Sequence, residues 1–456
     1  MAESGTASPT KLWQKGYTLN PTVERYTAGD AVLDNRLVEA DVLGSIAHAR
    51  MLGQIGLLAP DEVAALQKEL AHIAELARAG RFEVTVADED VHTKIENHLS
   101  ATVGEAGKKI HTARSRNDQV LVDLRLFTRV ELTKIEGLIL DCAAALADLA
   151  ERGRDVPMPG YTHMQRAMLS SVGVWAGSFA EALLDDLTVV RTAYAINDQS
   201  PLGSAASYGV PFDIDRQYVA DQLGFAKVQR NVLYAQHGRG KFEGLVVQAL
   251  AQVMLDLSKL AQDILLFTTS EYDFFRVAPE LCVGSSIMPQ KFNLEAMELV
   301  RARAQTMLAY QQQILGVVAG LPSGFNMDNQ ETKRPFMAAL DLAASSLEVC
   351  TFFVQGLAFN EAQLRAACSP ELFATDQAYA LVRGGMPFRD AYRQVAAHLD
   401  TLPPMDPTEQ LRTRTHLGAS GNLGLDALRD HLAAERAALD AQRERIARVE
   451  QALLTP

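Results

Sequence analysis

A ten-residue segment, 284–293, combines the side chains best suited to chemistry in this chain of 456 residues. It reads Gly-Ser-Ser-Ile-Met-Pro-Gln-Lys-Phe-Asn and ends just before a helical pattern of apolar residues that begins at Leu294. Lys291 is unfavourable near the start of a helix, because the exposed amides there already carry partial positive charge. A bound anion would make this lysine favourable. The residues alone leave two interpretations open: a loop that binds an anionic substrate, or a helix start in which Glu295 or Glu298 pairs with Lys291.

A second polar loop, Ser115-Arg116-Asn117, precedes the helix expected from Val120. An arginine guanidinium binds a carboxylate through two parallel hydrogen bonds. The same pattern is equally typical of a solvated turn in which Arg116 pairs with Asp118. Carboxylate binding and a simple turn therefore both remain open for this loop.

A third candidate is His163. Thr162 and Gln165 have the spacing of a capping box, which predicts that His163 lies in the first turn of a helix. The positive end of a helix favours the neutral imidazole, the form that accepts a proton. Taken alone, one histidine among the ten in the chain is more often structural.

The segment 284–293 resembles the signature loop of the fumarase/aspartase superfamily, whose members eliminate fumarate from substituted succinates. Within that superfamily, residues 111–119 and 160–167 resemble the argininosuccinate lyases, and the likeness begins near Leu12. The resemblance implies an all-α subunit of three parts with a central bundle of long helices. It also implies a homotetramer in which each active site draws loops from three subunits, and a carbanion-type elimination that uses no metal or organic cofactor.

The resemblance also implies roles for individual residues. Ser285 would be the base, Lys291 and Asn293 would meet the carboxylate that becomes doubly charged, and His163 paired with Glu298 would form a proton relay. Asp90 would meet a cationic group of the substrate. The catalytic set implied is Ser285, Lys291, His163, Glu298 and Thr162, and the substrate-binding set is Ser115, Arg116, Asn117, Asn293, Gln330, Lys333 and Asp90.

The chain departs from the argininosuccinate lyase pattern at two positions close to Gln330. Phe325 and Met327 stand where those enzymes have a tyrosine and a lysine. The loss of one hydrogen bond of a tyrosine costs about 1 kcal/mol, which weakens affinity without abolishing activity. Two alternatives stay open: a lyase for another substituted succinate, such as adenylosuccinate or aspartate, and a helical structural protein of this ancestry that has lost catalysis.

Composition narrows the class of protein. The net charge of -13 argues against nonspecific binding to nucleic acid. The four cysteines are widely spaced, which indicates reduced thiols and a cytoplasmic protein. Residues 1–10 are polar and small, so we expect a loose arm and not a signal peptide. The most apolar segment, 245–267, carries three charges, which is too many for a membrane span.

Helical periodicity dominates the chain. We expect helices over 35–58, 60–80, 120–150, 171–195, 242–270 and 294–318, and at most a minor strand or extended loop over 82–86. The last segment has a narrow apolar stripe and predicts a surface helix. The domains predicted are an N-terminal helical domain with a flexible arm over 1–112, a central bundle over 113–362, and a small C-terminal helical domain over 363–456.

Overall fold

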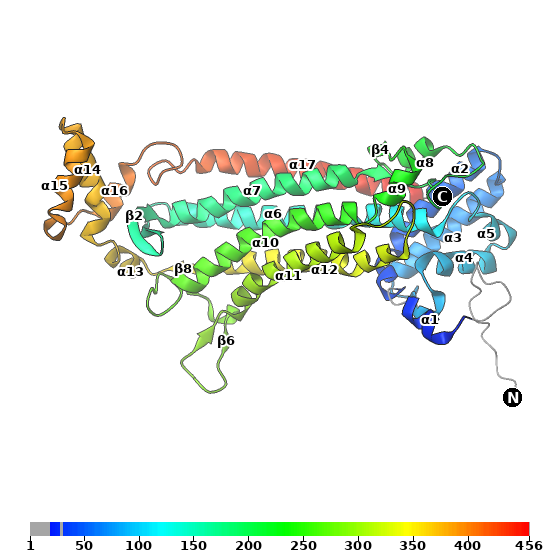
Figure 1. Cartoon of the computed structure of the whole chain (residues 1–456), viewed down its shortest axis with the longest axis horizontal. Helices are drawn as coiled ribbons and strands as arrows, with labels where there is room; N and C mark the ends of the chain where they lie inside the picture. Colours follow the sequence, from blue (N-terminus) through cyan, green and yellow to red (C-terminus); the bar gives the residue numbers. More distant parts are fainter. Residues whose placement is uncertain (1–18, 28–30, 456) are drawn as a thin grey trace.

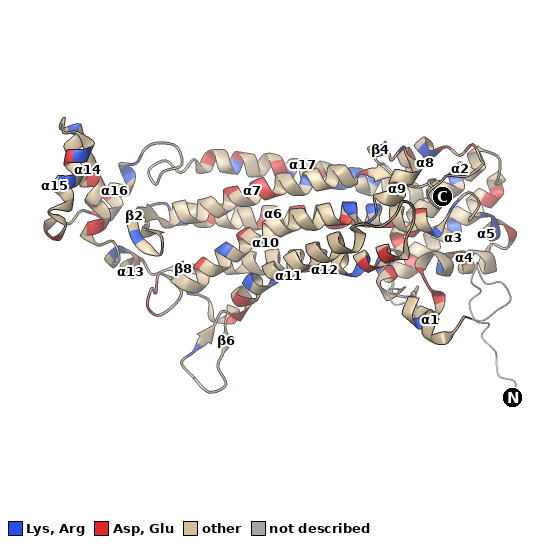
Figure 2. Ribbon diagram, viewed as in Figure 1, with Lys and Arg blue, Asp and Glu red and all other residues tan. Residues whose placement is uncertain are grey.

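The computed structural model describes residues 19–27 and 31–455, so the arm expected over 1–10 lies outside the described residues. Helices make up most of the described chain, as the sequence predicts. The molecule is elongated: long helices lie side by side along its length, and shorter helices gather at each end (Figure 1). Charged residues of both signs are interspersed along the whole molecule (Figure 2).

The bundle is built from helices of 23 to 37 residues. The longest, α6, spans about 55 Å at roughly 1.5 Å per residue. Helix α10 is apolar around most of its girth and packs on α7, α11 and α12, which cover its apolar faces. The bundle helices are α6 (Arg116–Arg152), α7 (Val172–Asn197), α10 (Lys241–Phe267), α11 (Glu295–Val318), α12 (Lys333–Gln355) and α17 (Leu425–Leu454).

The N-terminal end packs short helices around α2 and the start of α6. Pro60 occupies the first turn of α3, where its missing N–H costs nothing. Residues 82–86 form no strand, because the side chain of Asn35 takes both backbone hydrogen bonds of Val84. The elements here are α1 (Pro21–Thr27), η1 (Ala31–Arg36), α2 (Val38–Gln54), α3 (Pro60–Arg78), η2 (Val86–Asp88), α4 (Val91–Thr102) and α5 (Glu105–Lys109).

The opposite end holds the small helices that follow residue 360 (Figure 1). Helix α17 then runs back along the bundle and buries one narrow apolar stripe, so the surface helix expected from the sequence is confirmed. Its last turn reaches the N-terminal end, where Arg50 donates to the carbonyl of Ala452. The small helices are α13 (Glu361–Ala366), η5 (Pro370–Phe373), α14 (Ala374–Arg383), α15 (Phe388–Ala396), η6 (Leu399–Thr401) and α16 (Pro407–Arg412).

The remaining elements are short connections between the bundle helices. Four two-stranded sheets occur in the described chain, two of which carry segments singled out by the sequence. The pairs are β1 (Pro157–Thr162) with β2 (Gln165–Ser171), β3 (Gln199–Ser200) with β4 (Lys227–Val228), β5 (Phe275–Val277) with β8 (Leu357–Phe359), and β6 (Val283–Gly284) with β7 (Phe292–Asn293). The short helices α8 (Arg216–Gln222), α9 (Val232–His237), η3 (Pro279–Leu281) and η4 (Met327–Thr332) complete the fold.

Two helical stretches, Lys241–Phe267 and Met327–Gln355, are long and apolar enough to cross a membrane by length and composition. Both belong to the bundle and pack on neighbouring helices. A core helix of a folded domain passes the same test, so this composition is explained by the bundle. The four cysteines are free, as expected, and burial raises the pKa of Cys142 to about 12.

Candidate active site

A cavity of about 150 Å³ lies at the N-terminal end of the bundle. It brings together five of the seven residues expected to bind substrate, although they come from three separate stretches of sequence. The start of α4, the start of α6 and the turn before α12 each supply one wall. Its lining residues are Thr27, Asp34, Glu89, Asp90, His92, Arg116, Asn117, Val120, Arg239, Phe325, Met327, Gln330 and Lys333.

Asp90 and Arg116 form an ion pair on the cavity wall. Arg116 Nη1 donates to Asp90 Oδ2 at 2.8 Å and to Glu89 Oε1 at 3.0 Å. Asp90 also caps α4, because its Oδ1 accepts from Thr93 N at 2.7 Å. Burial alone would raise the pKa of Asp90, but the charges of His92 and Arg116 lower it below its ordinary value. Asp90 is therefore an anion in a cationic setting.

Ser115 is the one member of the 115–117 loop that does not line the cavity. Its hydroxyl accepts from Asn117 N at 3.3 Å and caps α6. Asp118 completes the capping box through Ser115 N. The other carboxylate oxygen of Asp118 accepts from Gly203 N and Ala205 N at 2.9 Å each. These hydrogen bonds hold the 200–207 loop beside the start of α6. Asp118 therefore does not form the surface pair with Arg116 that the sequence left open.

Lys333 and Gln330 line the wall nearest α12. Lys333 Nζ lies 2.6 Å from Asp34 Oδ1 and both side chains are buried. Gln330 Oε1 accepts from Arg239 Nη2 at 2.5 Å. Asp34 also accepts from Val91 N, so it joins the start of α4 to α12.

Arg239 is a cavity residue that sequence reasoning missed. It stands between two glycines, and a Cβ at Gly240 would lie 2.2 Å from Val318 while φ there is +76°. A Cβ at Gly238 would lie 2.4 Å from the Phe242 ring. A Gly-Arg-Gly triplet at a helix start is a signal that could have identified this arginine. Glycines have no Cβ, so the backbone on both sides of Arg239 can pack closely against its neighbours, and this packing directs the arginine side chain.

Phe325 and Met327 line the same cavity, so both departures from the family pattern lie at the site. Phe325 is held by its backbone, whose N–H donates to Ser207 Oγ at 3.2 Å. Its ring faces the Arg239 guanidinium at 6.0 Å. Met327 is 47% exposed at the rim. A tyrosine hydroxyl and a lysine amine are thus missing from the wall that carries Gln330.

The signature segment forms a hairpin that projects from the bundle (Figure 1). β6 and β7 pair through Gly284 and Phe292, and Ile287 at the tip is 82% exposed. Ser285 Oγ accepts hydrogen bonds from Ile287 N at 3.3 Å and Met288 N at 3.0 Å. Two backbone amides therefore point at this hydroxyl oxygen.

The hairpin leads directly into α11, which confirms that Asn293 lies close to a helix N-terminus. Glu298 is exposed in the first turn. Within the described part of the chain, Lys291 forms no ion pair with Glu295 or Glu298, so the simple paired helix start is not what the structure contains. The amine of Lys291 is exposed.

The helix predicted around His163 is wrong. Thr162 ends β1 and Gln165 begins β2, and His163 and Met164 form the two-residue turn between them, with φ of 52° and 62°. Two positive φ angles match a type I′ hairpin turn. The capping-box spacing occurs here by coincidence, because Tyr161 and the strand that follows pair across the turn. Thr162 and His163 are both exposed at the tip.

The expected site residues thus lie in separate places along one chain. The 24 residues of α11 separate the signature hairpin from Gln330, a distance of about 36 Å along the helix. The 37 residues of α6 separate Arg116 from the hairpin that carries His163 by about 55 Å. No small substrate can span these distances.

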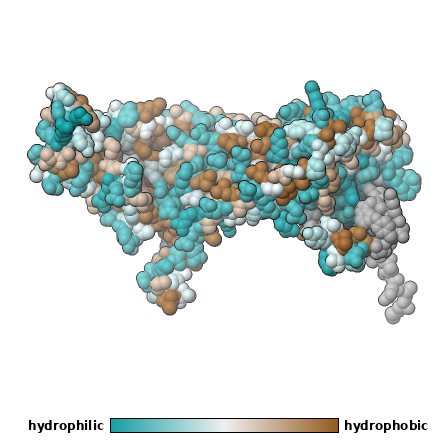
Figure 3. Space-filling view, in the orientation of Figure 1, coloured by the Kyte–Doolittle hydropathy of each residue, from teal (hydrophilic) through white to brown (hydrophobic). Residues whose placement is uncertain are grey.

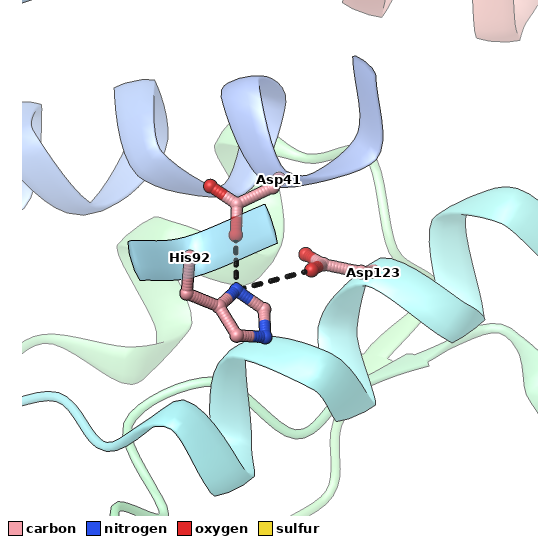
Figure 4. Close-up of side chains that lie close together, drawn as sticks. All are labelled: Asp41, His92 and Asp123. Carbon is pink, nitrogen blue, oxygen red and sulfur yellow. Dashed lines mark hydrogen bonds and ion pairs between the residues drawn. The ribbon is translucent and has the colours of Figure 1, made fainter. Parts of the chain in front are cut away.

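A buried group of one nitrogen and two carboxylates lies behind the cavity. Atoms of Asp41, His92 and Asp123 approach within 4.8 Å of one another (Figure 4). Such a donor set is the kind that could hold a metal ion. Here, however, His92 Nδ1 contacts Asp41 directly, which places a proton where the metal would bind.

A family model described as lyase matches residues 20–308 of the chain. An argininosuccinate lyase of Sorangium cellulosum (strain So ce56) is 46% identical over 419 residues, covering 92% of this chain and 97% of that protein. Another, from Thermotoga neapolitana, is 41% identical over 387 residues, covering 85% and 97%.

Solved structures share the fold. An EDDS lyase in complex with formate superposes with a TM-score of 0.81 at 23% identity, covering 96% of this chain and 95% of that chain. A class II fumarase from Schistosoma mansoni superposes with a TM-score of 0.70 at 14% identity, covering 86% and 95%. The family model and the curated relatives show a lyase of the fumarase/aspartase type, and the helical fold agrees with it. The chain belongs to the lyase family and, within it, to the argininosuccinate lyases.

Proposed function

We propose that this protein cleaves argininosuccinate into arginine and fumarate in the cytoplasm, as a step of arginine biosynthesis. The family membership supports the reaction class, and the cavity supports the substrate. A ligand with carboxylates at both ends and a guanidinium between them matches walls that carry Arg116, Lys333 and Arg239 as cations and Asp90 as an anion.

The observation that carries the proposal is the setting of Ser285. A serine hydroxyl is a weak base until its alkoxide is stabilised. The N–H groups of Ile287 and Met288 already point at Ser285 Oγ, so they would stabilise negative charge on it. Loss of the proton beside a substrate carboxylate builds a second negative charge on that carboxylate. Lys291 and Asn293 would stabilise this charge.

His163 would then protonate the departing guanidine nitrogen, with Thr162 beside it and Glu298 as its acidic partner. The tip of a tight hairpin suits this role, because both side chains are free to enter a site formed by another molecule. The roles of Ser115 and Asp118 are structural in this proposal: they set the start of α6, which aims Arg116 and Asn117 into the cavity.

Because one chain cannot bring the hairpins to the cavity, the proposal requires sites shared between copies of the chain, and we propose a homotetramer. Apolar side chains left uncovered on the bundle support it (Figure 3). On α11, Leu299 is 51% exposed and Leu315 is 44% exposed, and Phe352 on α12 is 61% exposed. Long apolar helices exposed in this way are typical of surfaces that pack against other copies.

The test is a direct assay of fumarate by its ultraviolet absorbance. Purified protein is given argininosuccinate, adenylosuccinate and aspartate in turn. Release from argininosuccinate alone is expected. Release from one of the other two instead would mean that Phe325 and Met327 have changed the substrate, and silence with all three would mean that the chain is a structural protein.

A further inference from the structure

His92 lies on the wall of the cavity but belongs to none of the roles assigned so far. It comes from the first turn of α4, two residues after the anion Asp90. Its Nδ1 contacts Asp41, while Nε2 lies on the side of the ring away from Asp41 (Figure 4). No described residue forms a hydrogen bond with Nε2.

Asp41 fixes the proton on His92 Nδ1. The Asp41 carboxylate is buried on α2 and accepts from Ser45 Oγ at 3.1 Å as well as from His92. Ser45 in turn accepts from Arg114 Nη1 at 2.8 Å. Burial raises the pKa of Asp41, but His92 and Arg114 lower it below its ordinary value, so Asp41 is an anion at neutral pH.

Asp123 is the second carboxylate beside the imidazole, at 3.6 Å from Nδ1. It is buried on α6, and neither of its oxygens has a hydrogen-bond partner within the described chain. Burial raises the pKa of Asp123 well above its ordinary value, and the charges of Asp41 and Asp34 raise it further. These effects favour the neutral form of the Asp123 carboxyl, which can donate to Asp41.

The charges around His92 come from every element that packs on it. Asp34 on η1, Asp41 on α2, Asp90 before α4 and Asp123 on α6 face it, while Arg114 neutralises part of this charge. Burial lowers the pKa of His92, but Asp41, Asp90 and Asp34 raise it above its ordinary value. These carboxylates favour the imidazolium form of the ring, which carries an N–H group on both nitrogens.

We propose that His92 binds a carboxylate of the substrate through its Nε2–H, with Asp41 holding the Nδ1 proton in place. The inference rests on the proposed function for its substrate and adds a fourth cation to the cavity. The carboxylate comes from one of two sources, the amino-acid half of the substrate or the succinyl half. Asp41 and Asp123 act through His92 and are positioning residues.

The test compares His92→Asn with His98→Asn. His98 lies on the same helix and pairs with Glu69 outside the cavity, so it controls for loss of a helix histidine. Because a hydrogen bond to a charged group contributes about 1.5–3 kcal/mol, His92→Asn should raise KM about 10- to 100-fold while kcat stays within about threefold. The control should leave both constants unchanged.

The pH profile separates binding from a merely structural role. In the wild-type enzyme KM should rise at alkaline pH as His92 loses its proton, whereas KM of His92→Asn should be high at every pH. An unchanged KM in a folded His92→Asn variant would overturn the inference. Equal loss of kcat at every pH together with a lower Tm would overturn it too.

Calorimetry with arginine and with succinate tests binding apart from turnover. Weaker binding of arginine alone places the contact in the amino-acid half, and weaker binding of succinate alone places it in the succinyl half. Equal loss of both would refute the contact, since one N–H cannot bind both ends. Absence of fumarate release with normal arginine binding would contradict the proposed function only; a wild-type protein that binds neither ligand would overturn the His92 contact.

Two further variants test the carboxylates. Asp123→Asn keeps a neutral donor beside Asp41, so KM should stay within about threefold of wild type. Asp41→Asn removes the anion and should raise KM as His92→Asn does. A larger rise in KM for Asp123→Asn than for Asp41→Asn would contradict this arrangement of the two carboxylates.

If His92→Asn does not fold, calorimetry of the wild type in two buffers of different ionisation heat replaces it. Proton uptake on binding at alkaline pH supports the inference, and its absence overturns it.

Discussion

Two inactive variants of this protein should regain activity when their chains are mixed. The variants are Ser285→Ala in the signature hairpin and Arg116→Ala on the cavity wall. In one chain α11 keeps the hairpin about 36 Å from the turn that carries Gln330. In the proposed site, the hairpin therefore comes from one copy and the cavity from another.

The size of the recovery follows from this geometry. In an equimolar mixture that reassembles at random, half of the hairpins carry Ser285 and half of the cavities carry Arg116. About a quarter of the sites then contain both wild-type groups, so about a quarter of wild-type activity should return. If both groups came from the same chain, no site would contain both and no activity would return.

The assay dissociates both proteins in mild denaturant, mixes them, removes the denaturant and follows fumarate release. A matched control mixes Arg116→Ala with Asn117→Ala. Both of these residues line the cavity of one chain, so every cavity keeps one defect and the mixture should show no recovery. Native mass spectrometry verifies that hybrids form. Hybrids without activity in the first mixture would refute the shared site.

Four further outcomes are expected. Ser285→Ala should lose at least about 100-fold in kcat with an unchanged Tm, because the alkoxide that the two backbone amides would stabilise can no longer form. His163→Asn should lose one limb of the pH–rate profile. Phe325→Tyr, which places a hydroxyl near Arg239, should lower KM by up to about fivefold. Asp186 has a pKa raised to about 7, mainly by burial and then by Asp256. The contribution of protonated Asp186 to stability is present below the pKa of this group in the unfolded chain and is lost as pH rises through 7. Asp186→Asn should therefore raise Tm near about pH 8 and leave it unchanged near about pH 4.

The long helices followed from the sequence for a physical reason, and the cavity residues followed from the resemblance to the family. Helical periodicity over 294–318 specifies α11 because one apolar stripe must face α10 and α12. Ser115 and Asp90 were expected from short motifs that resemble the family, and the structure adds that each of them caps a helix. These signals are local, and local signals can be read from one sequence.

The features that the sequence could not give depend on contacts between distant segments. His163 is a different case, because the neighbouring strands β1 and β2 pair across it and this local pairing overrides the capping-box spacing. Arg239 reaches Gln330, 91 residues further along the chain, only because α10 and α11 lie side by side. Asp41, His92 and Asp123 share no motif spacing, since three helices bring them together.

The cavity is electrostatically prepared before substrate arrives. Its cations each already contact an internal acceptor: Arg116 contacts Asp90, Lys333 contacts Asp34, and His92 contacts Asp41. These contacts hold the cationic side chains in fixed positions. Substrate binding therefore does not have to order side chains that were mobile in solvent. A substrate that carries carboxylates and a guanidinium can pair with these cations and with Asp90 while Asp41 keeps its contact with His92, so it brings charges of both signs to the cavity. A ligand with only one sign of charge cannot do so, and we therefore expect it to bind more weakly than a zwitterionic substituted succinate.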